Sequence, residues 1–154
     1  MSTQAKCLVT SSVAILCDWQ NVKGTPVQLR CLMSFACKIG TIALKRVYAH
    51  WRHENSKCEE LFDDCDFECL NIPSSKQKRN NVDKKLIADC RQQVLNNPDI
   101  TTVILLSGDG DFNGLVRDLK AKGKKVIVIA KCLKNVSKKL VEVADEFYLL
   151  EQLC

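Results

Sequence analysis

The chain has 154 residues and a mass of 17.3 kDa, which fits a single domain over residues 1–154. Hydrophobic residues make up 46% and charged residues 27% of the sequence, proportions that argue against a disordered chain. The net charge is +5, and no apolar run approaches the roughly 20 residues that cross a membrane, so we expect a soluble, cytoplasmic protein without membrane association.

Short apolar runs alternate with amphipathic stretches along the whole chain. The runs predict strands at 13–17, 41–48, 67–72, 102–106, 126–130 and 147–150. The stretches predict helices at 26–39 behind a Thr25 cap, at 55–64, from Asn80 or Asn81 to 95, at 112–121 and at 135–143. Strands that alternate with helices and are almost wholly apolar favour an α/β, three-layer Rossmann-like fold, with a mostly parallel central sheet and helices on both faces.

The sequence contains ten cysteines at irregular spacings. Several lie in apolar or amphipathic stretches, namely Cys17, Cys31, Cys37 and Cys90, as is typical of cysteines that serve as small buried hydrophobes in a reducing compartment. We therefore expect no disulfide. There is no C-x-x-C pair, so a zinc site is not expected either.

Basic residues gather in three groups in the second half of the chain. The first is Lys76, Lys78 and Arg79; the second is Lys120, Lys122, Lys124 and Lys125; the third is Lys131, Lys134, Lys138 and Lys139. Each group alone is compatible with a solvated face. The three together favour an anionic partner, either nucleic acid or a phosphate-bearing ligand.

Acidic residues follow the ends of predicted strands or begin a helix that leads away from one. Asp18 ends the first strand, Asp109 and Asp111 follow the fourth, and Asp83 begins the helix after the third. Because ligands bind at the carboxyl ends of strands in such sheets, we expect these side chains to meet at one edge. Each is also compatible with a turn or helix cap. Four converging carboxylates repel one another unless a cation neutralises them, and Mg²⁺ or Mn²⁺ prefers such oxygen ligands.

Two other motifs overlap the turn after the fourth strand. Residues 109–114 fit the start of an EF-hand loop, but Lys120 stands where the loop needs a bidentate Glu. Gly108, Gly110 and Gly114 suggest a dinucleotide-binding turn, but their spacing is not G-x-G-x-x-G and aspartates lie between them. We therefore reject both.

Three motifs together resemble the NYN domain, a branch of the PIN-like nuclease superfamily, and its LabA-like bacterial group. They are Asp18-x-x-Asn21, Asn80-Asn81-Val82-Asp83-x-x-Leu86-x-x-Asp89, and Ser107-Gly108-Asp109-x-Asp111-Phe112. The last is the most specific, and the resemblance covers nearly the whole chain. It implies a PIN-like fold, a Mg²⁺ or Mn²⁺ site and RNA cleavage. The bulky pair Trp19-Gln20 departs from the family pattern and is expected to shape the pocket.

The resemblance implies roles for single residues. Asp18, Asp83, Asp109 and Asp111 would hold the metal and serve catalysis, Asn21 would orient a ligand or phosphate, and Ser107 would support the turn. Asp89 is expected to face solvent near Lys85, because six positions from Asp83 is about 240° around a helix. Lys76, Lys78 and Arg79 are candidates for RNA backbone contacts. Trp19 is a candidate for base stacking, with core packing as the alternative.

These residues favour a metal-dependent ribonuclease in which metal-activated water hydrolyses the phosphodiester bond. The alternative is a non-catalytic RNA-binding or regulatory module that retains the acidic metal site. The expected partner is RNA. The sequence leaves the oligomeric state open, a homo-oligomer included.

Overall fold

The structure is a computed structural model that describes residues 11–73 and 81–154. Six strands form one wholly parallel sheet in the order β3-β2-β1-β4-β5-β6. The strands are β1 (Ser12–Asp18), β2 (Thr41–Ala49), β3 (Glu68–Asn71), β4 (Thr102–Leu106), β5 (Lys125–Ala130) and β6 (Glu146–Leu149). The predicted α/β fold with a parallel central sheet is confirmed, and each predicted strand lies within a few residues of its place.

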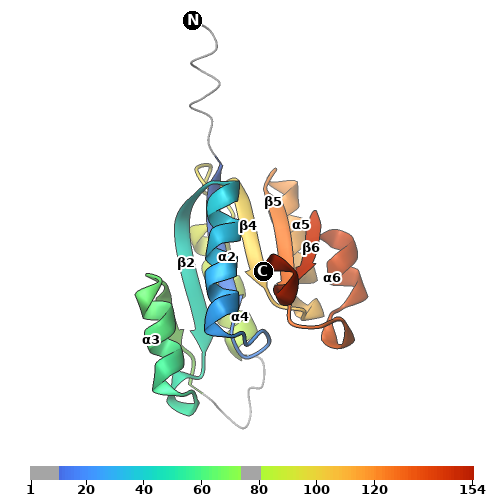
Figure 1. The fold of residues 1–154 in the computed structure, drawn as a ribbon. Helices are drawn as coiled ribbons and strands as arrows, with labels where there is room; N and C mark the ends of the chain where they lie inside the picture. The colour runs from blue at the N-terminus through green and yellow to red at the C-terminus, as the bar shows by residue number, and fades with distance from the viewer. Residues whose placement is uncertain (1–10, 74–80) are drawn as a thin grey trace, which may run out of the picture.

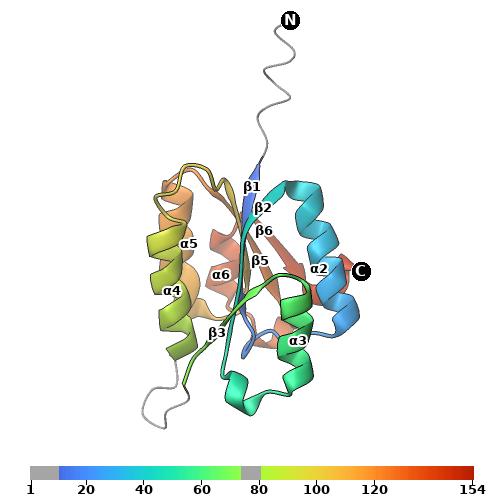
Figure 2. The same ribbon diagram turned by 90° about the vertical axis from the view of Figure 1, so that its left-hand side faces the viewer.

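Five α-helices cover the two faces of the sheet within the described residues. They are α2 (Pro26–Ile39), α3 (Ser56–Asp64), α4 (Asn81–Gln93), α5 (Asn113–Ala121) and α6 (Lys138–Val143). Figure 2 shows α2 and α3 on one face and α4, α5 and α6 on the other. None of these helices is long and apolar enough to cross a membrane.

Short 3-10 turns account for the differences from the predicted helices. They are η1 (Trp51–His53), η2 (Gly110–Phe112), η3 (Leu133–Asn135) and η4 (Leu150–Leu153). The helix predicted at 135–143 begins only at Lys138, because Ser137 caps it by accepting the N–H of Leu140 at 3.3 Å. The turn η4 had no signal in the sequence pattern.

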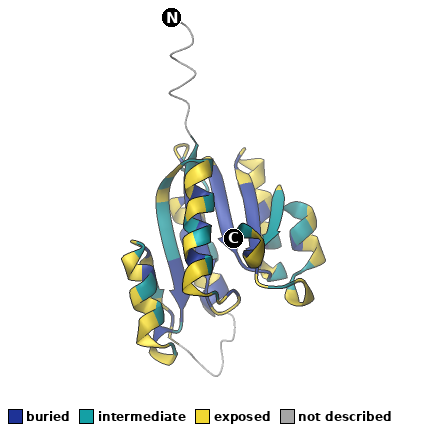
Figure 3. Cartoon of the chain, in the orientation of Figure 1, coloured by how far each residue is buried: buried dark blue, intermediate teal, exposed yellow. Residues whose placement is uncertain are grey.

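Both faces of the central strands are buried, which explains their unbroken apolar sequences (Figure 3). In β1, Val13 and Ile15 join the core beneath α2 and α3, whereas Ala14 and Leu16 join the core beneath α4, α5 and α6. A strand with only one buried face would alternate with polar residues. The alternation of side chains thus gives each strand a part in both layers.

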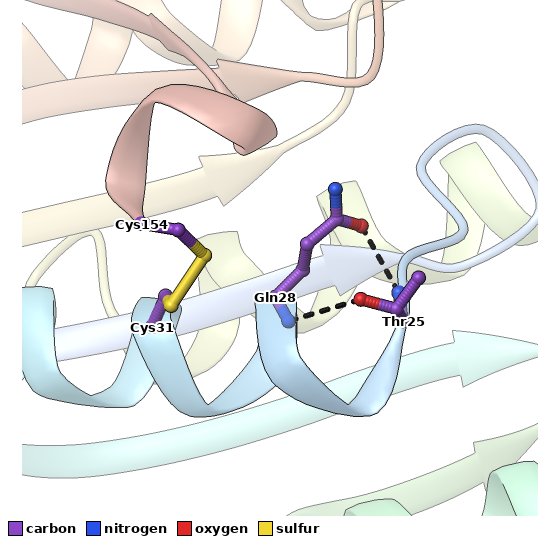
Figure 4. Close-up of a disulfide and its surroundings, with 4 residues drawn as sticks. All are labelled: Thr25, Gln28, Cys31 and Cys154. Carbon is purple, nitrogen blue, oxygen red and sulfur yellow. Dashed lines mark hydrogen bonds between the residues drawn. A yellow bond between two sulfur atoms is a disulfide. The ribbon is translucent and has the colours of Figure 1, made fainter.

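Helix α2 begins and ends where local chemistry requires it. Thr25 Oγ1 accepts the N–H of Gln28 at 3.1 Å, and Gln28 Oε1 accepts the N–H of Thr25 at 3.0 Å, which forms a capping box (Figure 4). Such caps contribute about 1 kcal/mol. At the other end, a side chain on Gly40 would lie 2.1 Å from the carbonyl oxygen of Ser11. Glycine is therefore required there by close approach of the backbone.

The strand order reverses at β1. From β1 the chain moves outward through β2 to β3, and α4 then carries it back to β4 on the other side of β1. The crevice at such a reversal is the usual ligand site of open parallel sheets. Here it lies between the carboxyl ends of β1 and β4, at the lower edge of the sheet in Figure 1.

A disulfide joins Cys31 of α2 to Cys154 at the end of η4 (Figure 4). The prediction of ten free thiols is therefore wrong. Cys17 and Cys90 are buried and free, as expected of core cysteines. Cys31 instead lies on the part of α2 to which η4 returns, with a Cα–Cα distance of 5.3 Å to Cys154, within the range a disulfide spans.

We expect non-reducing alkylation and peptide mass spectrometry to recover one cross-linked peptide that contains Cys31 and Cys154. The bridge closes a sequence separation of 123 residues, so it restricts the unfolded chain strongly and its loss should lower the melting temperature. Cys31→Ser and Cys154→Ser should each lower it equally, and the double variant should fall no further. Recovery of all ten cysteines as free thiols from protein kept without reductant would contradict this.

Candidate metal centre at the carboxyl edge of the sheet

Asp18, the last residue of β1, is buried at the strand reversal. Its side chain is 2% exposed, and Oδ2 accepts a hydrogen bond of 3.3 Å from Ser107 Oγ. Oδ1 has no hydrogen-bond partner among the described residues. Burial raises the pKa of Asp18 to about 6, an increase that hydrogen bonds from Asp83 and Ser107 limit. A buried carboxylate with an unpartnered oxygen favours a cation nearby.

Two turns meet at this point and are joined by polar contacts. Asn21 Oδ1 accepts the N–H of Gly108 at 2.8 Å, which fastens the turn after β1 to the turn after β4. Ser107 Oγ also accepts the N–H of Asp109 at 3.2 Å. In the next turn, Asp109 Oδ1 accepts the N–H of Asp111 at 2.9 Å. These contacts fix the acid turn, residues 107–111, against the end of β1.

Asp83 enters the site from the first turn of α4. Its side chain is 7% exposed. Burial raises the pKa of Asp83 to about 8, and a hydrogen bond to Asp109 and repulsion by the neighbouring carboxylates add to the rise. Without a metal ion, Asp83 therefore holds a proton near neutral pH and shares it with adjacent acids. A bound cation would stabilise the ionised form of Asp83 in place of this proton.

Three of the four predicted acids offer oxygen atoms that lie close together. One carboxylate oxygen from each of Asp83, Asp109 and Asp111 lies within 4.8 Å of the other two. Asp18 is hydrogen-bonded to Asp83 and so adjoins this group. The donor set consists of hard oxygen atoms, and one buried oxygen of Asp18 has no partner within residues 11–73 and 81–154, so the residues fit a hard divalent cation.

A cavity of about 280 Å³ opens beside the acids. It is lined by Asp18, Gln20, Asn21, His50, Val82, Asp83 and Asp109. Gln20 lines the cavity, as expected of a residue of the pair Trp19-Gln20, whereas His50 was not among the predicted site residues. His50 Nδ1 lies 2.6 Å from the carbonyl oxygen of Ile72, and because that oxygen only accepts, Nδ1 carries the proton. His50 directly follows β2, so the strand-end rule that found Asp18 also applies to it.

Trp19 lies in the core, although it was a candidate for base stacking. Its side chain is 5% exposed, and its ring contacts the edge of Phe62 at a centroid distance of 4.7 Å. The alternative of core packing is thus correct: Trp19 directly follows β1 and packs against Phe62 of α3. Trp19 is not available to a base.

Asp89 is buried, although it was expected to face solvent. It is 5% exposed and accepts a hydrogen bond of 2.8 Å from Tyr48 Oη. Arg46 lies 3.3 Å and Lys85 3.1 Å from its carboxylate oxygens. Its separation from the acid cluster was expected, but its burial depends on β2, which packs against α4. The predicted RNA contacts Lys76, Lys78 and Arg79 lie outside the described residues.

The raised pKa values predict how the metal-free protein responds to pH. Between about pH 4 and 8 the folded state binds protons at Asp83 and Asp18 that the unfolded state has released. Stability is therefore greatest below the ordinary Asp pKa and falls as pH rises through these two values. In a chelator, the melting temperature should fall from pH 5 to pH 8.

Asp83→Asn should flatten this slope and melt about 5 °C above wild type at pH 8, because the asparagine needs no proton. Asp99→Asn is the matched control, since Asp99 is exposed at the opposite edge of the sheet. It should keep the wild-type slope. Parallel slopes for wild type and Asp83→Asn would show that Asp83 does not carry the raised pKa.

Known proteins share this architecture. Residues 12–151 match the NYN domain. A stretch of 145 residues is 28% identical to an uncharacterized protein of Methanocaldococcus jannaschii and covers 89% of this chain, which spans 57% of the length of that curated relative. The crystal structure of a protein of unknown function from Vibrio parahaemolyticus has 25% identity and a TM-score of 0.75, and covers 91% of this chain and 93% of its own.

The family match includes β1, α4 and the acid turn, and so all four acids. The LabA-like group within the family stays a prediction. Because the match extends over all but the two ends of the sequence, it assigns the whole described fold. The chain belongs to the NYN domain family, a branch of the PIN-like nuclease superfamily.

Proposed function

We propose that this chain is a metal-dependent ribonuclease that hydrolyses internal phosphodiester bonds of RNA, with Mg²⁺ or Mn²⁺ held by Asp18, Asp83, Asp109 and Asp111. The observation that carries the proposal is the group of three carboxylates, with Asp18 bonded to it, at the strand reversal of the sheet. Membership in a nuclease superfamily supports the same reaction.

The side chains around the cavity favour water as the nucleophile. Among the described residues that line the cavity, none is a serine, threonine or cysteine. Ser107 is buried and its hydroxyl is engaged by Asp18 and the Asp109 N–H. Cys17 is also buried, and burial raises the pKa of its thiol well above the ordinary value. Neither residue is poised for covalent catalysis.

The neutral polar groups of the cavity suit a phosphodiester and its sugars. Gln20 is held by the backbone N–H of His50, which donates to its Oε1 at 3.1 Å. Asn21 is held through the Gly108 N–H. Because both amide oxygens are occupied, each side chain presents its NH₂ group as a donor to phosphate oxygens.

The acids alone would repel a phosphate, so the proposed reaction requires a cation. When bound, a divalent ion supplies the positive charge that lowers the pKa of water and offsets the charge on the scissile phosphate. The chain contributes the carboxylates that would hold it, the Ser107 hydroxyl that donates to Asp18, and the Asn21 side chain that positions the acid turn through the Gly108 N–H. Such oriented outer contacts are typical of metal sites.

Asp109→Asn tests the proposal, because it removes one charge and keeps an oxygen for the Asp111 N–H. Wild type should gain about 5–10 °C in melting temperature at a Mn²⁺ concentration 100 times the Kd. The variant should gain little, and its stability without metal should hold or rise as repulsion falls. Cleavage of labelled RNA should drop by about two orders of magnitude.

Asp99→Asn serves again as the control and should behave as wild type in both measurements. Metal binding without RNA turnover by wild type, over several RNAs, would select the non-catalytic RNA-binding module instead. An equal Mn²⁺ shift in wild type and Asp109→Asn, or none in wild type at millimolar ion, rules out the metal site.

A further inference from the structure

The segment after β5 lies against the acid turn. The N–H of Ser137 donates to the carbonyl oxygen of Gly108 at 2.9 Å. A side chain on Gly108 would lie 3.2 Å from Val136 Cα, and one on Gly110 would lie 3.0 Å from Ser137 Oγ. Within this segment of residues 131–139, residues 135–137 are therefore packed against the acid turn, on the side of the site toward α6 (Figure 1).

This segment carries exposed positive charge that the fold does not use. Its four lysines are exposed and form no hydrogen bond or ion pair with any residue in the ranges 11–73 and 81–154; they are Lys131, Lys134, Lys138 and Lys139. Glu142 stands one helical turn after Lys138 but forms no ion pair with it in those ranges. Four like charges within nine residues repel one another unless an anion is near.

The neighbouring basic group shows the contrast. Lys124 is buried and donates to the carbonyl oxygens of Asn97 and Ile100, each at 2.6 Å. Lys120 donates to the carbonyl oxygen of Val143 at 2.8 Å. Lys125 pairs with Glu146. Three of the four lysines in the group Lys120, Lys122, Lys124 and Lys125 therefore join separate segments of the fold. The lysines after β5 have no such role in the described structure.

An exposed leucine lies among the free lysines. Leu133 of η3 is 67% exposed and stands between Lys131 and Lys134 in the sequence. Among the described residues, Val27 is the other large hydrophobic side chain that is exposed, and it lies in α2, on the opposite face of the sheet. Lysines bind the phosphates of a single-stranded nucleic acid, and an exposed apolar side chain can contact the face of one of its unpaired bases.

We propose that Lys131, Lys134, Lys138 and Lys139, with Leu133 among them, form a docking surface for single-stranded RNA beside the acid cluster. The inference rests on the proposed function, since it supplies that site with its substrate. Carboxylates alone repel the RNA backbone, and a cationic surface packed against their turn brings the phosphates to them. Leu133 contacts a base of the bound strand.

The test compares two double variants of the full chain. Lys134→Gln/Lys138→Gln removes two charges from the surface. Lys38→Gln/Lys122→Gln is the control and removes two exposed charges from the opposite, amino-terminal edge of the sheet. Lys38 lies near the end of α2, just before β2, and Lys122 directly follows α5, just before β5. Binding of a labelled single-stranded RNA is measured in EDTA, so that no strand is cut, over a range of salt concentrations.

The surface pair should reduce the slope of log Kd against log salt by about 1.4, or roughly 0.7 for each lost phosphate contact. At 0.1 M salt this corresponds to a loss of about 25-fold in affinity. The control pair should leave slope and affinity close to wild type. Leu133→Ser should reduce the preference for single-stranded RNA over a duplex of the same sequence. All variants should keep the melting temperature of wild type, because the changed side chains are exposed.

Equal losses of RNA affinity in the two double variants would overturn the inference. Equal affinity of wild type for duplex and single-stranded RNA would also overturn it. Competition by polyglutamate as strong as by RNA would mean that the surface recognises acidic protein. If wild type cleaves RNA in Mn²⁺ while the surface pair binds normally, this inference fails and the proposed function stands. If RNA binds through these lysines but is never cleaved, the proposed function fails and the docking surface stands.

Discussion

Repulsion between buried carboxylates is the constraint around which the carboxyl edge of the sheet is organised. Asp18 and Asp83 are almost wholly buried, and each lies beside another acid. Burial and repulsion both penalise their charged forms, so in the absence of a cation they retain protons to a higher pH than an exposed aspartate does. A divalent ion would replace those protons with two positive charges. The same geometry thus costs stability in the metal-free protein and provides affinity for metal.

Asp89 shows that burial alone does not make a metal site. It lies on the same helix as Asp83 and is as deeply buried, but Arg46 and Lys85 neutralise it and Tyr48 donates a hydrogen bond. The charged neighbours of Asp83 are carboxylates, whereas those of Asp89 are cations. Two aspartates six residues apart on α4 therefore have different uses: one fastens α4 to β2, and the other is left for a ligand.

Precise placement of the acids depends on contacts between segments far apart in the chain. The Asn21–Gly108 and Ser107–Asp18 hydrogen bonds span separations of 87 and 89 residues. Val136 and Ser137 pack against the two glycines of the acid turn, where a side chain would make tight contacts. The strand reversal at β1 brings these segments to one edge. The segment after β5 begins at the same edge because β5 is parallel to β4.

The sequence by itself determined the order of strands and helices, because apolar periodicity is local, and the gathering of acids, because parallel strands end at a common edge. It did not determine what Trp19 and Asp89 face, since Phe62 and Arg46 lie on elements more than 40 residues away. The Cys31–Cys154 bridge and the cavity wall at His50 likewise belong to the tertiary structure. Periodicity specifies which face of an element is apolar, but only packing decides which distant side chain meets it.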